Sequence, residues 1–224
     1  MVKIYVFNVS EYQKSKESSL FTENSPFTYF AEKSKKEKSE RARMTLAEGE
    51  LLLLAMKSES SEKIPAGKFE TTEFGKLIFT KTDKSAKNID FSIAHSNGVL
   101  VVAVSDIGAV GVDIERADRE IDRGVAKKFL SDFSPSSDAL FAKLYRAEMS
   151  DDGISAAPTD VVEERRAELG DTERWCAMEA LVKMSGEGLA AHGKAAKLQE
   201  TARLSVFTYK EKGAVYTLAV ALAR

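Results

Sequence analysis

Residues 110–115, Val-Gly-Val-Asp-Ile-Glu, constrain this chain more than any other stretch. They follow the apolar run 99–104, and both runs have the β-branched composition of strands in a largely buried sheet. Because strand side chains alternate between faces, Asp113 and Glu115 point the same way. Two carboxylates held so close repel each other, and a divalent cation such as Mg²⁺ between them removes that cost. The alternative is that both charges simply face water at a strand end.

Composition places the chain among ordinary globular proteins of one or two domains, with 224 residues, 43% hydrophobic and 30% charged. With a single cysteine, Cys176, no intrachain disulfide can form, so we expect a reducing compartment, the cytoplasm. The net charge of −2 argues against nucleic-acid binding. The longest apolar runs are too short to span a membrane, and the first residues are typical of a strand rather than a signal peptide.

Strand-like and helix-like segments occur in both halves, which predicts an α/β (α+β) fold. We expect strands at 2–8, 77–79, 88–94, 98–105 and 110–115, and a C-terminal hairpin of 203–209 and 214–222. We expect helices at 34–56, 118–130, 133–149, 161–169 and 175–184, and loops at 9–24 and 150–157. Two similar-sized α/β lobes, 1–108 and 109–224, fit this distribution.

The segment 175–184 is the most unusual predicted helix, because apolar residues lie on nearly every side of it. Only Glu179 and Lys183 are charged, and their i, i+4 spacing places them on one face. One interpretation is a surface ion pair worth about 0.2–0.5 kcal/mol. A helix this apolar should instead be buried, where charges need partners. The pair is therefore a candidate for a functional site.

Basic residues gather before and within the front half of the predicted helix 34–56, in the stretch 33–38 and at Arg41 and Arg43. They form either a solvated helix face or a set of cations of which one or two reach an anionic ligand. Further along, Lys76 follows a glycine in a turn, and His95 and Ser96 end a strand beside an Asn-Gly turn. A histidine at such a place is commonly a local hydrogen-bonding residue.

Two of these segments together resemble the motifs of the 4′-phosphopantetheinyl transferases, in particular the surfactin-synthetase type. Their first motif, Val/Ile-Gly-Ile/Val-Asp-x-Glu, fits residues 110–115 throughout. Their second, Trp-(small)-x-Lys-Glu-Ala/Ser-x-x-Lys, fits residues 175–183 except at Met178, where the family has lysine. Upstream, residues 75–76 resemble the family's Gly-Lys-Pro segment, and residues 94–96 its Ser-His-Ser strand end, with alanine in place of the first serine.

The resemblance implies two α/β lobes related by pseudo-twofold symmetry, with the active site in the cleft between them. It implies that coenzyme A is cleaved at its pyrophosphate, that the phosphopantetheine arm passes to a serine of an apo acyl or peptidyl carrier protein, and that 3′,5′-ADP leaves. A cleft within one chain would allow a monomer. The carrier can belong to fatty-acid biosynthesis or to the polyketide and peptide pathways of secondary metabolism.

The resemblance also implies roles for single residues. Mg²⁺ would be bound by Asp113, Glu115 and Glu179, with Lys183 neutralising the departing phosphate and Glu179 as the base for the carrier serine. The coenzyme A phosphates would be contacted by Lys76, His95, Ser96, Lys183 and one of Arg41 or Arg43. Two other interpretations stay open: a non-catalytic relative that binds coenzyme A or a carrier, suggested by Met178 and Ala94, and a Mg²⁺-dependent phosphohydrolase. A nucleotide triphosphatase is disfavoured because the chain lacks a Walker-type glycine loop.

Overall fold

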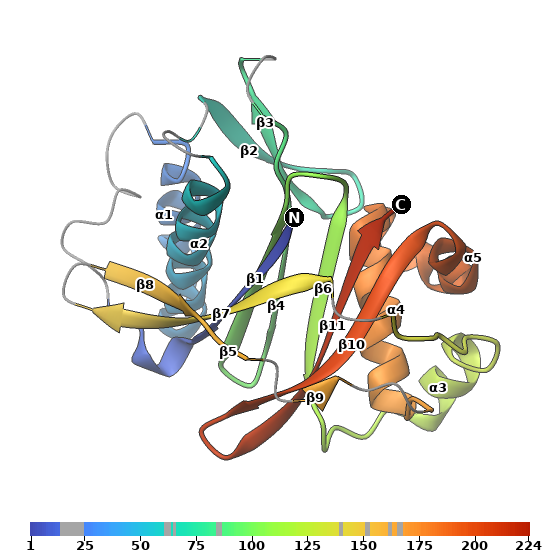
Figure 1. Ribbon diagram of the computed structural model, residues 1–224. Coiled ribbons are helices and arrows are strands. Elements are labelled where there is room, and N and C mark those ends of the chain that lie inside the picture. The colour runs from blue at the N-terminus through green and yellow to red at the C-terminus, as the bar shows by residue number, and fades with distance from the viewer. Residues whose placement is uncertain are drawn as a thin grey trace.

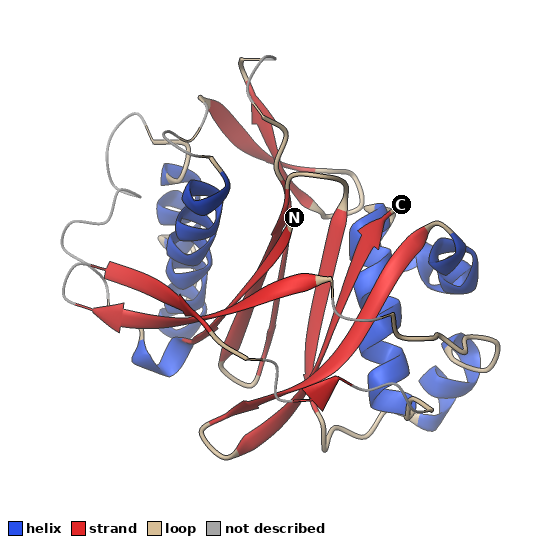
Figure 2. Cartoon of the chain, viewed as in Figure 1, coloured by secondary structure: helices blue, strands red, loops and turns tan. Residues whose placement is uncertain are grey.

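Two β-sheets pack face to face, and helices cover the outer face of each (Figures 1 and 2). This computed structural model describes residues 1–13, 25–60, 64, 66–83, 87–138, 141–150, 153–160, 163–164 and 168–224. The predicted mixed α/β fold is confirmed. The pseudo-twofold relation between two lobes stays a prediction. No helix within these described ranges is both long and apolar enough to cross a membrane.

The first sheet has the strand order β4-β5-β1-β7-β8. Its strands are β1 (Val2–Asn8), β4 (Asp90–Ser96), β5 (Val99–Ser105), β7 (Ala142–Ser150) and β8 (Gly153–Pro158). The central strand β1 pairs antiparallel with β5 and parallel with β7. Because β7 and β8 come late in the chain, residues 142–158 complete a sheet whose other strands lie before residue 106. The division at residues 108 and 109 stays a prediction.

The second sheet has the order β6-β11-β10-β9, with β6 at Val110–Arg116, β9 at Glu163–Glu164, β10 at Ala202–Glu211 and β11 at Ala214–Ala223. The predicted C-terminal hairpin is confirmed, since β10 and β11 pair along their whole length. A small hairpin of β2 (Gly67–Thr71) and β3 (Leu77–Lys81) stands apart from both sheets. Its turn carries Lys76 toward the second half of the chain.

The helices are α1 (Thr28–Ser34), α2 (Ser39–Glu59), α3 (Arg123–Phe129), α4 (Asp171–Ser185) and α5 (Ala195–Glu200), with short 3₁₀ helices η1 (Val9–Glu11) and η3 (Gly188–Lys194). The predicted helices 34–56 and 175–184 correspond to α2 and α4. The helix predicted from residue 118 begins later, because Asp122 caps α3 by accepting hydrogen bonds from the backbone N–H groups of Gly124 and Val125.

Three sequence predictions in the middle of the chain are wrong. The helix expected at 133–149 is not formed at residues 142–149, which belong to strand β7, where pairing with β1 and β8 overrides a helix-prone composition. The loop expected at 150–157 is largely strand β8. The helix expected at 161–169 is not formed at residues 163–164, which pair with β10. Residues 161–162 and 165–167, like 14–24 of the loop expected at 9–24, lie outside the described residues.

Apolar side chains fill three layers. One cluster lies between α2 and the first sheet, a second between the two sheets, and a third between α4 and the second sheet. Aliphatic residues of β1, β5, β6 and β11 dominate the middle layer. The alternate residues of β5 and β11 face the two helix layers, which explains why these two strands are apolar on nearly every residue. The sandwich therefore fixes where β6 lies, and with it the two carboxylates that β6 carries.

The edge strands of the two sheets, β4 and β6, lie side by side but belong to different sheets. Side chains of β4 bond the backbone of β6: the amide of Val110 donates to Asp90 Oδ2 at 2.8 Å and the amide of Val112 to Ser92 Oγ at 3.1 Å. We call this contact the β4–β6 seam. It satisfies amides of a buried edge strand that would otherwise lack partners.

Candidate functional site

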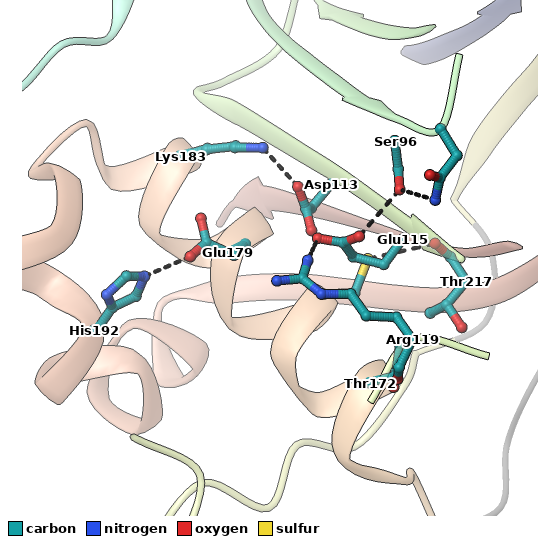
Figure 3. A network of polar contacts seen from close by, with 11 residues as sticks. Ser96, Asp113, Glu115, Arg119, Thr172, Glu179, Lys183, His192 and Thr217 are labelled. Carbon is teal, nitrogen blue, oxygen red and sulfur yellow. Dashed lines mark hydrogen bonds and ion pairs between the residues drawn. The ribbon is translucent and has the colours of Figure 1, made fainter. Parts of the chain in front are cut away.

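Helix α4 lies directly against β6, and this contact places the charged residues of both motifs side by side (Figure 3). The contact is possible because residue 111 is glycine: a β-carbon there would lie 1.9 Å from the carbonyl oxygen of Ala180 on α4. Asp113 follows two residues later, buried with 6% of its surface exposed. Across from it, Glu179 and Lys183 lie one turn apart on α4.

Lys183 and Asp113 form an ion pair, in which Nζ donates to Oδ1 at 2.6 Å. Burial raises the pKa of Asp113, and the neighbouring ammonium of Lys183 offsets part of that rise. Burial alone would lower the pKa of Lys183, but the carboxylates of Asp113 and Glu179 raise it overall, so the amine stays protonated. The second oxygen of Asp113, Oδ2, is buried without a hydrogen-bond partner in the described part of the chain.

The other two carboxylates also have cationic or polar partners. Glu115 pairs with Arg119 through Oε1 and accepts a hydrogen bond from Ser96 Oγ through Oε2, at 3.1 Å. Glu179 Oε1 lies 2.7 Å from Nε2 of His192. Glu179 is close enough to Asp113 for its charge to raise the pKa of that buried carboxyl. The structure thus brings Asp113, Glu179 and Lys183, which belong to the two motifs, close together.

These residues suit a Mg²⁺ ion in their chemistry. Carboxylate oxygens are the ligands that Mg²⁺ prefers, and the buried Oδ2 of Asp113 has no hydrogen-bond partner in the described part of the chain. Among the described residues, however, no three carboxylate, histidine or cysteine side chains are already arranged around one point. Each carboxylate is held by a cation or by histidine instead. The ligand roles of Asp113, Glu115 and Glu179 remain predictions.

A cavity of about 370 Å³ opens beside this cluster, a volume within the range of small-molecule sites. Glu179 and Lys183 form one wall, and Lys33, Arg41, Lys76 and His95 come from the first half of the chain. Lys76 reaches it from the β2–β3 turn, where its Nζ donates to Asp90 Oδ2 at 3.0 Å. Apart from Glu179 and the buried Glu48, the ionisable residues of the wall favour an anionic ligand.

Arg41 and His95 meet across the cavity wall, with Arg41 Nη1 3.1 Å from His95 Nε2. Because a guanidinium only donates, His95 must accept through Nε2, which requires a neutral ring. Burial lowers the pKa of His95, and the positive charges of Arg41 and Lys183 lower it further. Arg41 also lies 3.6 Å from the buried carboxylate of Glu48. Burial raises the pKa of Glu48.

Two predicted coenzyme A contacts lie elsewhere. Arg43 is exposed and is not among the described residues that line the cavity, because it lies on a different face of α2 from Arg41. Ser96 faces Glu115 and holds that carboxylate. Sequence reasoning missed Arg119 and His192. The only signals for them were the four-residue spacing of Arg119 from Glu115, and the fact that His192 is one of two histidines in the chain.

Residues 109–217 match the model of the 4′-phosphopantetheinyl transferase superfamily. The matched region is just under half of the 224 residues and contains both β6 and α4, and with them all three carboxylates and Lys183. The match supports the family resemblance, and with it phosphopantetheine transfer in general terms. No curated protein matches the chain.

Proposed function

We propose that this protein is a Mg²⁺-dependent, surfactin-synthetase-type transferase that converts an apo acyl or peptidyl carrier protein to its holo form with coenzyme A. One observation carries the proposal. Lys183 bonds the buried Asp113, and Lys183 and Glu179 line a cavity whose wall also bears Arg41, Lys76 and His95. Both walls belong to one chain, which supports a monomer. The proposed compartment is the cytoplasm, where the buried free thiol of Cys176 stays reduced.

In this mechanism the first half of the chain binds and orients coenzyme A. The phosphates of coenzyme A carry several negative charges. Among the described residues of the cavity wall, Arg41, Lys33 and Lys76 are cations that can pair with them. We assign the 3′-phosphate to Arg41 rather than to Arg43, because Arg41 is the one that faces the cavity. Neutral His95 can donate a hydrogen bond to a phosphate oxygen through Nδ1 while it accepts from Arg41 through Nε2.

Asp113, Glu115 and Glu179 would hold the metal ion. When bound, Mg²⁺ supplies positive charge that offsets the pyrophosphate and the charge released as its bond breaks. Glu179 accepts the proton of the carrier serine hydroxyl, whose oxygen attacks the phosphorus on the pantetheine side of the pyrophosphate. The bond from that phosphorus to the bridging oxygen breaks, and 3′,5′-ADP leaves with the electron pair. The ammonium of Lys183 neutralises the departing oxygen.

Met178 takes the place of a lysine that the family motif carries. It is fully buried in the apolar layer under α4, so this position contributes no charge to the cavity. Lys183 is then the cation that α4 contributes to the described cavity wall. This difference favours, as the second candidate, a relative that binds coenzyme A without transferring its arm.

The test is a mass measurement on the carrier. The protein is incubated with coenzyme A, Mg²⁺ and an apo carrier, and we expect a gain equal to one phosphopantetheine. The gain should disappear with EDTA and in Asp113→Ala. A matched control is Asp118→Ala, which removes an exposed carboxylate nearby that is bonded to Arg116. Coenzyme A binding without a mass gain would support the non-catalytic relative, and phosphate release without a carrier the phosphohydrolase.

A further inference from the structure

The Glu179 carboxylate is hydrogen-bonded by a histidine, His192, that belongs to neither motif. His192 Nε2 lies 2.7 Å from Glu179 Oε1, and Figure 3 shows the imidazole on the side of Glu179 away from Asp113. The ring nitrogen must be the donor, because an ionised carboxylate only accepts. The second oxygen of Glu179 points away from His192 (Figure 3). One oxygen is thereby fixed and the other is left for the cavity.

The imidazole is itself firmly seated. His192 is 4% exposed, and two aromatic rings flank it: Phe129 at the end of α3, 5.2 Å between ring centroids, and Trp175, 5.7 Å away. The described lining of the cavity does not include Trp175. Trp175 lies one turn before Glu179 on α4, so the same helix carries the carboxylate and the ring that supports its partner.

The backbone after α4 is shaped to bring His192 back to this helix. Gly186 ends α4 with φ +74°, and Gly188 follows with φ +62°, both in the left-handed region that glycine adopts without strain. The chain therefore reverses into η3, which carries His192 to within hydrogen-bond distance of Glu179. The two glycines set the path of the chain, the two aromatic rings pack against His192, and His192 bonds the Glu179 carboxylate.

From these contacts we infer that His192 is a positioning residue that holds the Glu179 carboxylate in the orientation needed for metal binding and proton transfer. A glutamate on a helix has three rotatable side-chain bonds, and a buried donor that fixes one oxygen removes most of that freedom. Partners that hold metal-binding or catalytic groups in this way commonly change affinity or activity by about 10–100-fold when removed. The inference rests on the proposed function of Glu179.

The test compares His192→Leu, which keeps apolar bulk but has no donor, with His192→Gln, whose amide nitrogen reaches about as far as Nε2. Affinity for Mn²⁺, a spectroscopic substitute for Mg²⁺, is measured by electron paramagnetic resonance on the free protein, and kcat and KM for coenzyme A by carrier modification. In His192→Leu we expect Mn²⁺ affinity and kcat to fall about 10–100-fold, with KM for coenzyme A changed by less than about threefold. His192→Gln should recover most of both losses.

A folded His192→Leu with unchanged Mn²⁺ affinity and kcat would overturn the inference, as would a His192→Gln as impaired as the leucine variant. If His192→Leu does not fold, His192→Asn replaces it, because its amide is one bond too short to reach Glu179. Equal values for the glutamine and asparagine variants would then overturn the inference. Weakened Mn²⁺ binding in a protein that modifies no carrier would instead disprove the proposed function and leave the positioning role intact.

Discussion

Gly111 on β6 and Ala180 on α4 are in direct contact. A β-carbon at position 111 would lie 1.9 Å from the carbonyl oxygen of Ala180 and 2.4 Å from the amide nitrogen of Met184. The helix can rest on the strand only because residue 111 has no side chain. The same contact sets the distance between Asp113 and Lys183, so the glycine of the first motif positions the charges of both motifs.

Gly111→Ala is therefore expected to destabilise the protein strongly. The added carbon meets backbone atoms, which cannot rotate away, so the cost should reach or exceed the ~1–3 kcal/mol usual for overpacking. Urea denaturation with matched m-values is the measurement. Gly193→Ala is the control, because a β-carbon there meets nothing within 4 Å. Equal midpoints for the two variants would contradict this account of the α4–β6 contact.

Lys183→Met should destabilise the fold by leaving the buried Asp113 carboxylate without its cation. Breaking a buried pair usually costs ~3–5 kcal/mol, and the 31% exposure of the Lys183 side chain places this one near or below the lower end. Adding Asp113→Asn should recover part of the loss. The free energies of unfolding of the two single variants and the double variant form the cycle. Strict additivity would show that the pair is not coupled.

Removing metal should stop catalysis without unfolding the protein. Lys183 and Arg119 each form an ion pair with one of the three carboxylates, and His192 hydrogen-bonds the third, so each carboxylate has a partner before any ion binds. In EDTA we expect native circular dichroism and cooperative unfolding, with no carrier modification until Mg²⁺ is restored. Loss of native structure in EDTA would indicate instead a structural metal, of the kind on which small metal-dependent folds rely.

Arg41→Gln should weaken coenzyme A binding, because Arg41 lines the cavity and contacts His95. A hydrogen bond to a charged group is worth ~1.5–3 kcal/mol, which corresponds to a rise in KM of about 10–100-fold. Arg43→Gln is the matched control, with the same change on the same helix outside the cavity wall. With coenzyme A that lacks its 3′-phosphate, wild type and Arg41→Gln should be nearly equal. A comparable defect in Arg43→Gln would refute the assignment.

Stability should fall as the pH drops below the usual His95 pKa of 6.5. Burial and nearby cations lower the pKa of His95 in the folded protein. Below pH 6.5, His95 binds a proton in the unfolded chain but not in the folded chain. The free energy of unfolding therefore decreases with falling pH until the folded-state pKa of His95 is reached. Between pH 7.5 and 5, wild type should lose more unfolding free energy than His95→Gln. Urea denaturation at the two pH values measures these losses. Equal losses of unfolding free energy in wild type and His95→Gln would contradict a lowered pKa of His95.

Where candidate site residues are close in sequence, the sequence predicts that their side chains lie on the same face of a strand or helix. The two-residue spacing of Asp113 and Glu115 and the four-residue spacing of Glu179 and Lys183 each define a shared face. The apolar runs of β5 and β6 also identified buried strands. Once the buried helix α4 packs on the buried strand β6, Lys183 lies close enough to bond Asp113.

Other features depend on contacts that no local pattern contains. The alanine, lysine and glutamate residues of 142–149 favour a helix, and only the neighbouring strands β1 and β8 make them a strand. Helical phase separates Arg41 from Arg43, but sequence alone did not show which face meets the cavity. The partnership of His192 with Glu179 depends on the path that the chain takes through Gly186 and Gly188.

At the β4–β6 seam, the alignment of the two sheets depends on hydrogen bonds from backbone amides to side chains. In an ordinary ladder, backbone carbonyls accept the bonds and almost any sequence preserves them. Here the acceptors are the oxygens of Asp90 and Ser92, and Lys76 shares the same Asp90 oxygen. Single point substitutions in β4 can thus loosen this contact between the two sheets while the strand pairing within each sheet is kept. Because residues of β4 and α4 both line the cavity, its width can be adjusted by evolution or by design, one residue at a time.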